Sequence, residues 1–399
     1  MPKLLSVNVP WRILLAFAVV LYPAPGVAAD VEPEPRVVLI GFSGALSGVS
    51  EELGKSLANA ADMALAEANR LQLRVSGQRV AFRLLRHDDR GDPVTAVEVA
   101  RQLLHAGVVA VVGTANSSTS DAVARLYSDA GVALISPTAS ATALTERGYT
   151  SFFRLIDHDD HAGRSLGHYV VRDMRLRRLA VIDNGSMYGV GVATSFFTQV
   201  RASGATVVVR ERISYASNLS QLVRRLRQRG TEALFFGGYA AQAAQLAQTV
   251  RREGGGMRLL MASSGVVGAS FLIAARSGAD GTVAIESGVP TSAMPGWRRF
   301  EDEYQQRFGL HLHGLTPFAY DAAQVAVAAI RQSDSLDPRR IVQALRRISF
   351  RGLTGVVAFD AKGNPRHPQL SISEVRDQRW VPLRTIDVRH GDASRPGGS

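Results

Sequence analysis

Hydroxyl-bearing residues follow two neighbouring apolar runs of the sequence, at positions where a small polar ligand could be held. The first turn contains Ser117 and Ser118, and the second contains Thr138, Ala139 and Ser140. The apolar runs 109–112 and 132–135 predict buried parallel strands, with a helix between them. The carboxyl ends of such strands meet at one edge of a sheet, which is where open α/β sheets bind ligands. Serine hydroxyls and the N–H groups of a helix N-terminus would suit a carboxylate there.

A second group of residues has the types that bind metal ions. It is the run Asp157, His158, Asp159, Asp160 and His161, in which two histidines stand three residues apart among carboxylates. The run also lies where a predicted strand ends and a helix begins, and acidic residues commonly cap helices and suit their dipole. We therefore expect no metal ion and no cofactor. An α/β enzyme that uses this cluster is the alternative, which metal analysis of the purified protein would reveal.

Other motifs of catalysis or nucleotide binding do not occur. The glycine-rich stretch 41–48 has the spacing G-x-x-G-x-x-x-G, which differs from the dinucleotide-binding fingerprint. The sequence contains no Walker motif and no G-x-S-x-G nucleophile elbow. We expect no catalytic residues, and we interpret the stretch 41–48 as a turn that lines a binding cleft.

The N-terminus has the pattern of a cleaved secretory signal peptide over residues 1–29. Lys3 and Arg12 precede the short apolar run 13–22, and Val27-Ala28-Ala29 has the small residues of a cleavage site. The 399-residue chain has no cysteine, which excludes disulfides, thiolate metal ligands and a lipid anchor on cysteine. We expect an exported protein of the periplasm.

The chain is basic, with a formal net charge of +11. Its arginines gather in short groups such as 224–229, 175–178 and 346–347, in the last turns of predicted helices or just before strands. Solvated helix faces and helix C-termini explain such groups. No aromatic residues are interleaved with them as in nucleic-acid grooves, so we expect no nucleic-acid partner.

Strands and helices alternate through the two main parts of the chain, which predicts two doubly wound α/β lobes with a ligand between them. Several stretches also resemble one family, the leucine/isoleucine/valine-type periplasmic binding proteins of ABC transporters. The stretches include 44–48, 87–93, 117–120, 135–140, 188–191, 236–239, 319–322 and 352–363. The resemblance implies the type I periplasmic-binding fold, with two parallel-sheet lobes joined by a multi-strand hinge. It implies residues 36–157 plus 288–358 in the first lobe and 158–287 plus 359–390 in the second. The sequence of the last residues, 391–399, predicts a disordered tail.

The resemblance also implies the ligand-binding residues. Ser117, Thr138 and Ser140, with backbone N–H groups of their turns, would hold the ligand's α-carboxylate, and Tyr188 and Tyr239 would contact the ligand from the second lobe. Two positions depart from the family pattern: Ser264 stands where the family has the acid for the ligand's ammonium group, and the aliphatic Leu53 stands where an aromatic residue is common. Unless Asp321 or Glu286 supplies the acid, the ligand is better matched by an unaminated carboxylate or an amide than by an amino acid.

We therefore expect non-enzymatic solute capture by closure of the two lobes, and docking of the closed form on an inner-membrane ABC permease. A ligand sensor of the same fold that serves a signalling receptor is the alternative. Neighbouring permease and ATPase genes would favour transport.

Overall fold

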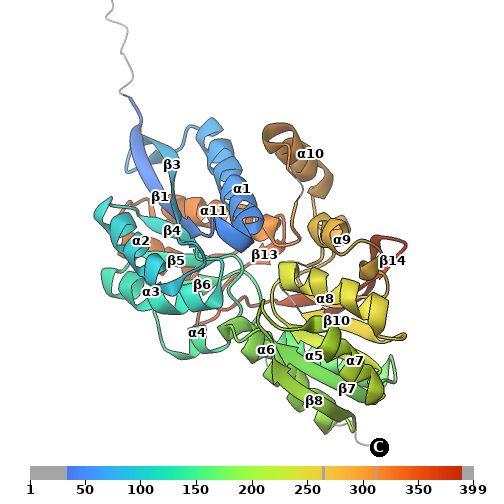
Figure 1. Ribbon diagram of the computed structural model, residues 1–399. Helices are drawn as coiled ribbons and strands as arrows, with labels where there is room; N and C mark the ends of the chain where they lie inside the picture. Colours follow the sequence, from blue (N-terminus) through green and yellow to red (C-terminus); the bar gives the residue numbers. More distant parts are fainter. Residues whose placement is uncertain (1–33, 263–265, 311, 389–399) are drawn as a thin grey trace, which may run out of the picture. The chain divides into compact units, whose positions relative to one another are not determined.

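The computed structural model describes residues 34–262, 266–310 and 312–388, and shows an α/β protein built on two large sheets (Figure 1). The expected signal peptide, Ser264 and the expected tail lie outside these residues. Among the described residues, no helix combines the length and the apolar character needed to cross a membrane.

The first sheet has the strand order β2-β3-β1-β4-β5-β6 and is parallel except for the short β2. Its strands are β1 Arg36–Gly44, β2 Arg74–Val75, β3 Gln78–Asp88, β4 Ala110–Gly113, β5 Ala133–Ser136 and β6 Phe152–Arg154. The sequence predicted β4 and β5 from two apolar runs, and both strands are entirely buried. Burial on both faces explains why these strands lack the alternation of a half-exposed strand.

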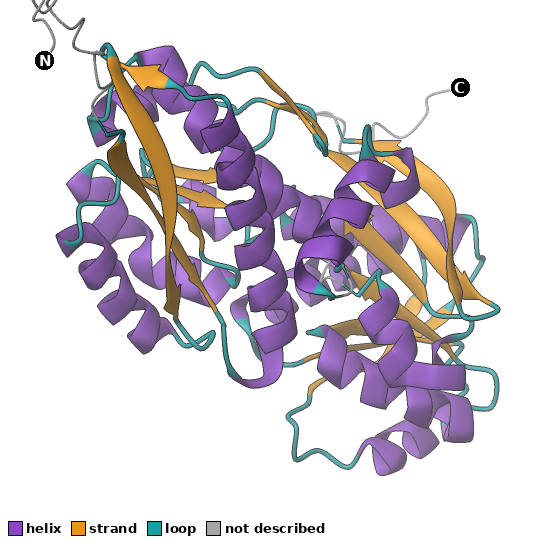
Figure 2. Ribbon diagram, turned by 90° about the horizontal axis from the view of Figure 1, so that it is seen from above, coloured by secondary structure: helices purple, strands orange, loops and turns teal. Residues whose placement is uncertain are grey.

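Helices cover both faces of this sheet (Figure 2). Val111 and Leu134 point to the face packed against α2 and α3, whereas Val112 and Ile135 point to the face packed against α1, α11 and α12. The helices of this lobe are α1 Glu51–Arg70, α2 Pro93–His105, α3 Ser117–Ala130, α4 Ala143–Glu146, α10 Trp297–Phe308, α11 Thr316–Ser333 and α12 Pro338–Leu345, with the 3-10 turns Gly48–Ser50 and Thr291–Ala293 beside them in the chain.

The second sheet has the order β15-β14-β11-β10-β9-β7-β8, with five parallel strands and an antiparallel pair at one edge. Its strands are β7 Arg178–Asp183, β8 Thr206–Arg212, β9 Ala233–Gly237, β10 Arg258–Ala262, β11 Val283–Ser287, β14 Gln369–Arg376 and β15 Arg379–Asp387. Its helices are α5 Asp159–Arg172, α6 Met187–Ala202, α7 Leu219–Gln228, α8 Ala240–Glu253 and α9 Ala269–Ala275, followed by the 3-10 turn Arg276–Ala279.

Two glycines let α5 and α6 pack closely on one face of the second sheet. A Cβ on Gly163 would lie 2.8 Å from the backbone oxygen of Val192, and one on Gly167 would lie 3.0 Å from the Cβ of Gln199. Side chains of α7, α8 and α9 pack on the opposite face of the sheet. Both sheets are thus doubly wound, as the sequence predicted.

The chain passes three times between the two sheets. It leaves the first sheet after β6, returns after β11 to helices whose side chains join the first lobe's core, and goes back to the second sheet at β14. Between these last two segments lies the hairpin of β12 Phe350–Gly352 and β13 Gly355–Val357. Three crossovers make up the expected multi-strand hinge.

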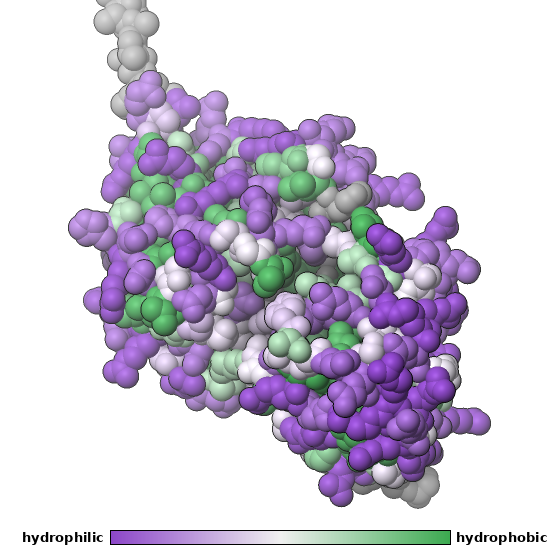
Figure 3. Space-filling view, in the orientation of Figure 1, coloured by the Kyte–Doolittle hydropathy of each residue, from purple (hydrophilic) through white to green (hydrophobic). Residues whose placement is uncertain are grey.

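The arginine groups lie on the outer faces of helices and on loops. Arg225 forms an ion pair with Glu211 at 2.6 Å, and Arg224 forms one with Glu253 at 3.1 Å. The face in Figure 3 is largely hydrophilic, and hydrophobic residues form scattered patches on it. The basic surplus is therefore distributed over solvated faces and partly neutralised by carboxylates.

Candidate ligand-binding site

Each sheet has a switch point, where the chain's winding reverses direction. In the first sheet it lies between β1 and β4, and in the second it lies between β7 and β9. Loops that leave the carboxyl ends of such strands diverge, which creates the crevice in which α/β sheets bind ligands. Leu53 follows β1 and Ser117 follows β4, whereas Tyr188 follows β7 and Tyr239 follows β9. The topology therefore places four of the predicted residues beside the two switch points.

The first-lobe part of the candidate site is the N-terminus of α3. Asn116 is the N-cap residue, but its side chain makes no capping hydrogen bond, and its buried Oδ1 has no partner. The first-turn N–H groups of a helix have no intrahelical acceptor and carry a partial positive charge. The start of α3 therefore retains donors for an anionic group.

A hydrogen bond joins this helix start to the second predicted turn. Ser117 is buried, and its Oγ accepts the backbone N–H of Ala141 at 3.1 Å. Because the Oγ acts as acceptor in that bond, the hydroxyl proton of Ser117 is available to a ligand. Ser118 is half-buried in the same helical turn.

The other residues of the second turn have structural partners. The Thr138 hydroxyl donates to the backbone oxygen of Ala115 at 2.7 Å, and the Ala139 N–H donates to Oγ of Ser136 at 3.0 Å. The buried Ser140 accepts the backbone N–H of Asp159 at its carbonyl oxygen. Thr138 can therefore offer only acceptor lone pairs to a ligand, a restriction that residue type does not reveal.

Leu53 lies at the edge of the first lobe, in the first turns of α1, where it is half-buried against the lobe's core. The next residue, Gly54, allows α1 to approach the loop after β1: a Cβ there would lie 1.8 Å from the backbone oxygen of Ala45. The glycine explains how the helix start can sit against that loop.

The second-lobe part of the candidate site is a pair of tyrosines. The rings of Tyr188 and Tyr239 are stacked, with centroids 5.8 Å apart, and the Tyr188 hydroxyl donates to the backbone oxygen of Ala262 at the end of β10. Two glycines permit this arrangement, because a Cβ on Gly189 would lie 2.5 Å from the oxygen of Gly237, and one on Gly237 would lie 2.4 Å from that of Gly189. Sequence reasoning had matched the motifs around these glycines but had not seen that they contact each other.

The two parts of the site adjoin. Met187, at the start of α6, packs against the hydrophobic cluster of α2 and α3, and α3 contacts α6 directly. Tyr188 is the next residue in α6, so the helix that carries it lies against the first lobe beside α3.

The acids that could bind a ligand's ammonium group have different environments. Asp321 is fully buried, and its oxygens accept the N–H groups of Leu353 and Thr354 and the Thr354 hydroxyl at 2.6–2.8 Å. Burial raises the pKa of Asp321, which these hydrogen bonds oppose. Asp321 thus holds the turn between β12 and β13. Glu286 instead lies near the carboxyl end of β11, the sheet edge that the tyrosines share, and accepts the Val267 N–H at 3.1 Å.

The predicted helix capping by the run 157–161 is wrong in one respect. The N-cap residue of α5 is His158, which makes no side-chain capping bond, so Asp157 precedes the N-cap position and Asp159 and Asp160 follow it. Asp159 and Asp160 lie in the first turn, and Asp160 accepts the Ser195 hydroxyl at 2.7 Å. Burial raises the pKa of Asp159 to about 7, although a hydrogen bond from the Ser140 hydroxyl opposes this shift. Burial lowers the pKa of His158 to about 4.

A buried arginine that sequence reasoning missed supports the second turn. Arg154 of β6 is completely buried and donates to the backbone oxygen of Ala141 at 3.0 Å and to the Thr145 hydroxyl at 2.9 Å. Burial lowers the pKa of Arg154 to about 10, so it stays charged at neutral pH. No local pattern in the sequence marks Arg154, because a single arginine at the end of an apolar strand is common and is usually exposed.

With this geometry established, comparison with known proteins decides the family. The periplasmic binding protein family matches residues 37–379. The chain belongs to the periplasmic binding proteins. The family consists of binding proteins, so the expectation of a binding protein rather than an enzyme is confirmed.

Individual relatives are similar over nearly the whole chain. The leucine-, isoleucine-, valine-, threonine- and alanine-binding protein of Pseudomonas aeruginosa is 27% identical over 369 residues, which cover 91% of this chain and 95% of that protein. A branched-chain amino acid transporter substrate-binding protein from Streptococcus pneumoniae, solved with isoleucine, superposes with a TM-score of 0.80 at 21% identity, covering 88% of this chain and all of that one. A solute-binding protein from Rhodopseudomonas palustris, solved with 3,4-dihydroxybenzoic acid, gives 0.79 at 17% identity, covering 89% and 98%. The expected type I fold is therefore confirmed.

Proposed function

We propose that this periplasmic binding protein is the solute-capturing component of an ABC importer. Its two lobes, 36–157 plus 288–358 and 158–287 plus 359–390, close on a ligand, and the closed form docks on an inner-membrane permease. The chain would reach the periplasm after removal of residues 1–29 and would carry no lipid anchor. Family membership and the similarity to amino acid-binding proteins support this proposal.

The observation that carries the proposal is the uncapped start of α3 beside Ser117, together with the contact of α3 with α6, the helix that carries Tyr188 of the tyrosine pair. The open N–H groups and the Ser117 hydroxyl would bind a carboxylate, and Tyr188 and Tyr239 would cover the ligand from the other lobe. Closure would exclude water, which strengthens such hydrogen bonds in a medium of low dielectric constant.

The ligand class is a small carboxylate. Proteins similar to this chain bind leucine, isoleucine and other amino acids, and one protein of the same fold binds an aromatic carboxylate without an amino group. The two classes differ in the ammonium group, which needs a carboxylate partner when it is buried. With Ser264 in place of the family's acid and Asp321 occupied by the 353–354 turn, Glu286 is the acid best placed to serve an amino acid.

A thermal-shift screen with matched compounds tests the function and the ligand class together. Each amino acid is paired with its unaminated analogue, such as leucine with 4-methylpentanoate, and benzoates and the corresponding amides complete the panel. A ligand at 100 times its Kd stabilises the fold by about 2.7 kcal/mol. We expect at least one carboxylate to raise Tm and its amide to have no effect. Absence of any shift across the panel, or an amide that matches its acid, would contradict carboxylate capture.

Transport and sensing are separated by uptake. In cells that carry the partner permease, deletion of the gene for this protein should abolish uptake of the radiolabelled ligand. Unchanged uptake with a lost transcriptional response would instead favour the sensor.

A further inference from the structure

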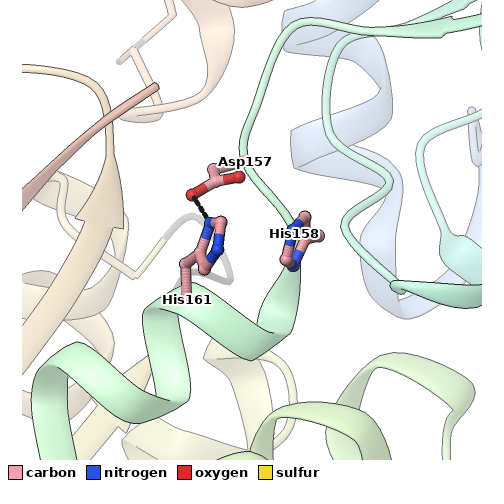
Figure 4. A group of neighbouring side chains, drawn as sticks. All are labelled: Asp157, His158 and His161. Atoms are coloured by element: carbon pink, nitrogen blue, oxygen red, sulfur yellow. Dashed lines mark hydrogen bonds and ion pairs between the residues drawn. The ribbon is translucent and has the colours of Figure 1, made fainter. Parts of the chain in front are cut away.

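The segment that leads into α5, together with the first turn of that helix, brings together three side chains of the kinds that bind transition metals. Asp157, His158 and His161 each offer one oxygen or nitrogen atom, and these atoms all lie within 4.8 Å of one another (Figure 4). Nδ1 of His161 lies 2.7 Å from Oδ2 of Asp157, and the two imidazole rings face each other with centroids 4.0 Å apart. The crossover and one helical turn therefore assemble a cluster from neighbouring residues.

Two atoms of this cluster are buried without a hydrogen-bond partner. They are Oδ1 of Asp157, whose side chain is completely shielded from solvent, and Nδ1 of His158. A buried polar atom without a partner costs about 1–3 kcal/mol. A bound cation would give both the carboxylate oxygen and the imidazole nitrogen a partner. The two unpartnered atoms therefore indicate a ligand at this cluster.

Charges of both signs surround the cluster. Arg154 lies close enough to interact electrostatically with Asp157, and the N-terminus of α5 adds a partial positive charge, both of which oppose a cation. Asp159 and Asp160 lie in the same turn, but Asp160 is paired with Arg164 and burial raises the pKa of Asp159 to about 7. Asp157 therefore supplies the main negative charge at the cluster. His161 also lines a cavity of about 1230 Å³ between α5, α6 and the end of β15, which provides a path for an ion from solvent.

We propose that Asp157, His158 and His161 bind one divalent transition-metal ion at the start of α5, with a remaining coordination position open to water or to a small ligand. Two imidazoles and one carboxylate are a donor set typical of Zn²⁺ sites with an open position, whereas Ca²⁺ and Mg²⁺ favour oxygen ligands. The site uses none of the proposed solute-binding residues as ligands, although Ser140 contacts Asp159 beside it, and it does not depend on the proposed function.

Calorimetric titration of the mature, tag-free protein with Zn²⁺ tests the site. We expect one ion per chain, and an affinity at least tenfold weaker in His158→Ala and in His161→Ala. His168→Ala is the matched control, because His168 is an exposed histidine of the same helix that lines the same cavity. Its affinity for Zn²⁺ should equal that of the wild type.

Thermal unfolding of the same variants shows whether each of them is folded. Thermal unfolding of the metal-free variants in EDTA should match that of the wild type within a few degrees, and Zn²⁺ should raise Tm only in the wild type and His168→Ala. If a variant fails to fold, His161→Gln replaces it. The proposal is wrong if Zn²⁺ does not bind, or if it binds the wild type and both cluster variants equally.

Discussion

Arg154 and Asn364 are 210 positions apart in the sequence, yet Nε of the arginine donates to Oδ1 of the asparagine at 2.8 Å. Arg154 ends β6, just before the first crossover, and Asn364 lies in the third crossover, before β14. Both residues are buried. The same guanidinium also binds the backbone of Ala141, so one side chain connects two crossovers of the hinge to a turn of the candidate site.

Replacement of Arg154 should therefore affect the whole fold. Arg154→Lys keeps the charge but loses the planar fork that serves Asn364, Ala141 and Thr145 together. We expect the free energy of unfolding to fall by about 3 kcal/mol or more in urea denaturation. Arg172→Lys, at the exposed end of α5, is the control and should change it by less than about 0.5 kcal/mol. Equal stability of Arg154→Lys and the wild type would refute this role.

Ser117→Ala should weaken ligand binding, because the hydroxyl is the side-chain donor at the open start of α3. Loss of a hydrogen bond to a charged group costs about 1.5–3 kcal/mol, which is roughly tenfold or more in Kd. Calorimetry with the ligand found in the screen measures the effect. Ser128→Ala, farther along α3, serves as the control and should bind normally. If both variants bind like the wild type, the carboxylate lies elsewhere.

The two tyrosines should respond differently to loss of their hydroxyls. Tyr188→Phe leaves the backbone oxygen of Ala262 without its buried donor, so the free energy of unfolding should fall by about 1–3 kcal/mol. Tyr239 is only half-buried, so Tyr239→Phe should leave stability within about 0.5 kcal/mol and lower ligand affinity. Urea denaturation measures the stability of both variants, and calorimetry measures their ligand affinity. If Tyr239→Phe were less stable than Tyr188→Phe, the assigned roles of the two hydroxyls would be wrong.

Asp89 should make stability depend on pH. Burial raises the pKa of this carboxyl above 3.8, although the Gly91 N–H and the Ser43 hydroxyl donate to it. The pKa of Asp89 is higher in the folded protein than in the unfolded chain. The contribution of Asp89 to stability is therefore complete below about pH 3.8 and is lost as the pH rises through the pKa of the folded protein. In Asp89→Asn, the amide can keep both partners without a charge, since a serine hydroxyl can also accept.

We therefore expect the free energy of unfolding of the wild type to fall relative to that of Asp89→Asn as the pH rises from 4, by at most about 1.4 kcal/mol per pH unit. Urea denaturation across this range measures the difference. Asp129→Asn, at the exposed end of α3, is the control. Parallel stability profiles for the wild type and Asp89→Asn would show that Asp89 has an ordinary pKa in the fold.

The sequence alone determined the alternation of strands and helices, the fully buried β4 and β5, and the helix between them. These features depend on local patterns, namely β-branched apolar runs, capping residues and a glycine stop, which act within a few residues of the chain. The order of those patterns predicted two doubly wound sheets, because short right-handed crossovers leave few ways to arrange them. The family came instead from the resemblance of short stretches such as 117–120 and 135–140.

Only the tertiary structure decided what the polar side chains do. Asp321 was a candidate for a ligand's ammonium group, but the 353–354 turn occupies its oxygens. The Thr138 hydroxyl donates a hydrogen bond to the backbone oxygen of Ala115. Arg154 had no local signature, and the capping expected of the 157–161 acids failed because His158 takes the N-cap position. Asp321, Thr138 and Arg154 share one reason: a buried polar group must find its partner wherever the fold brings one, and that partner is often far away in the sequence.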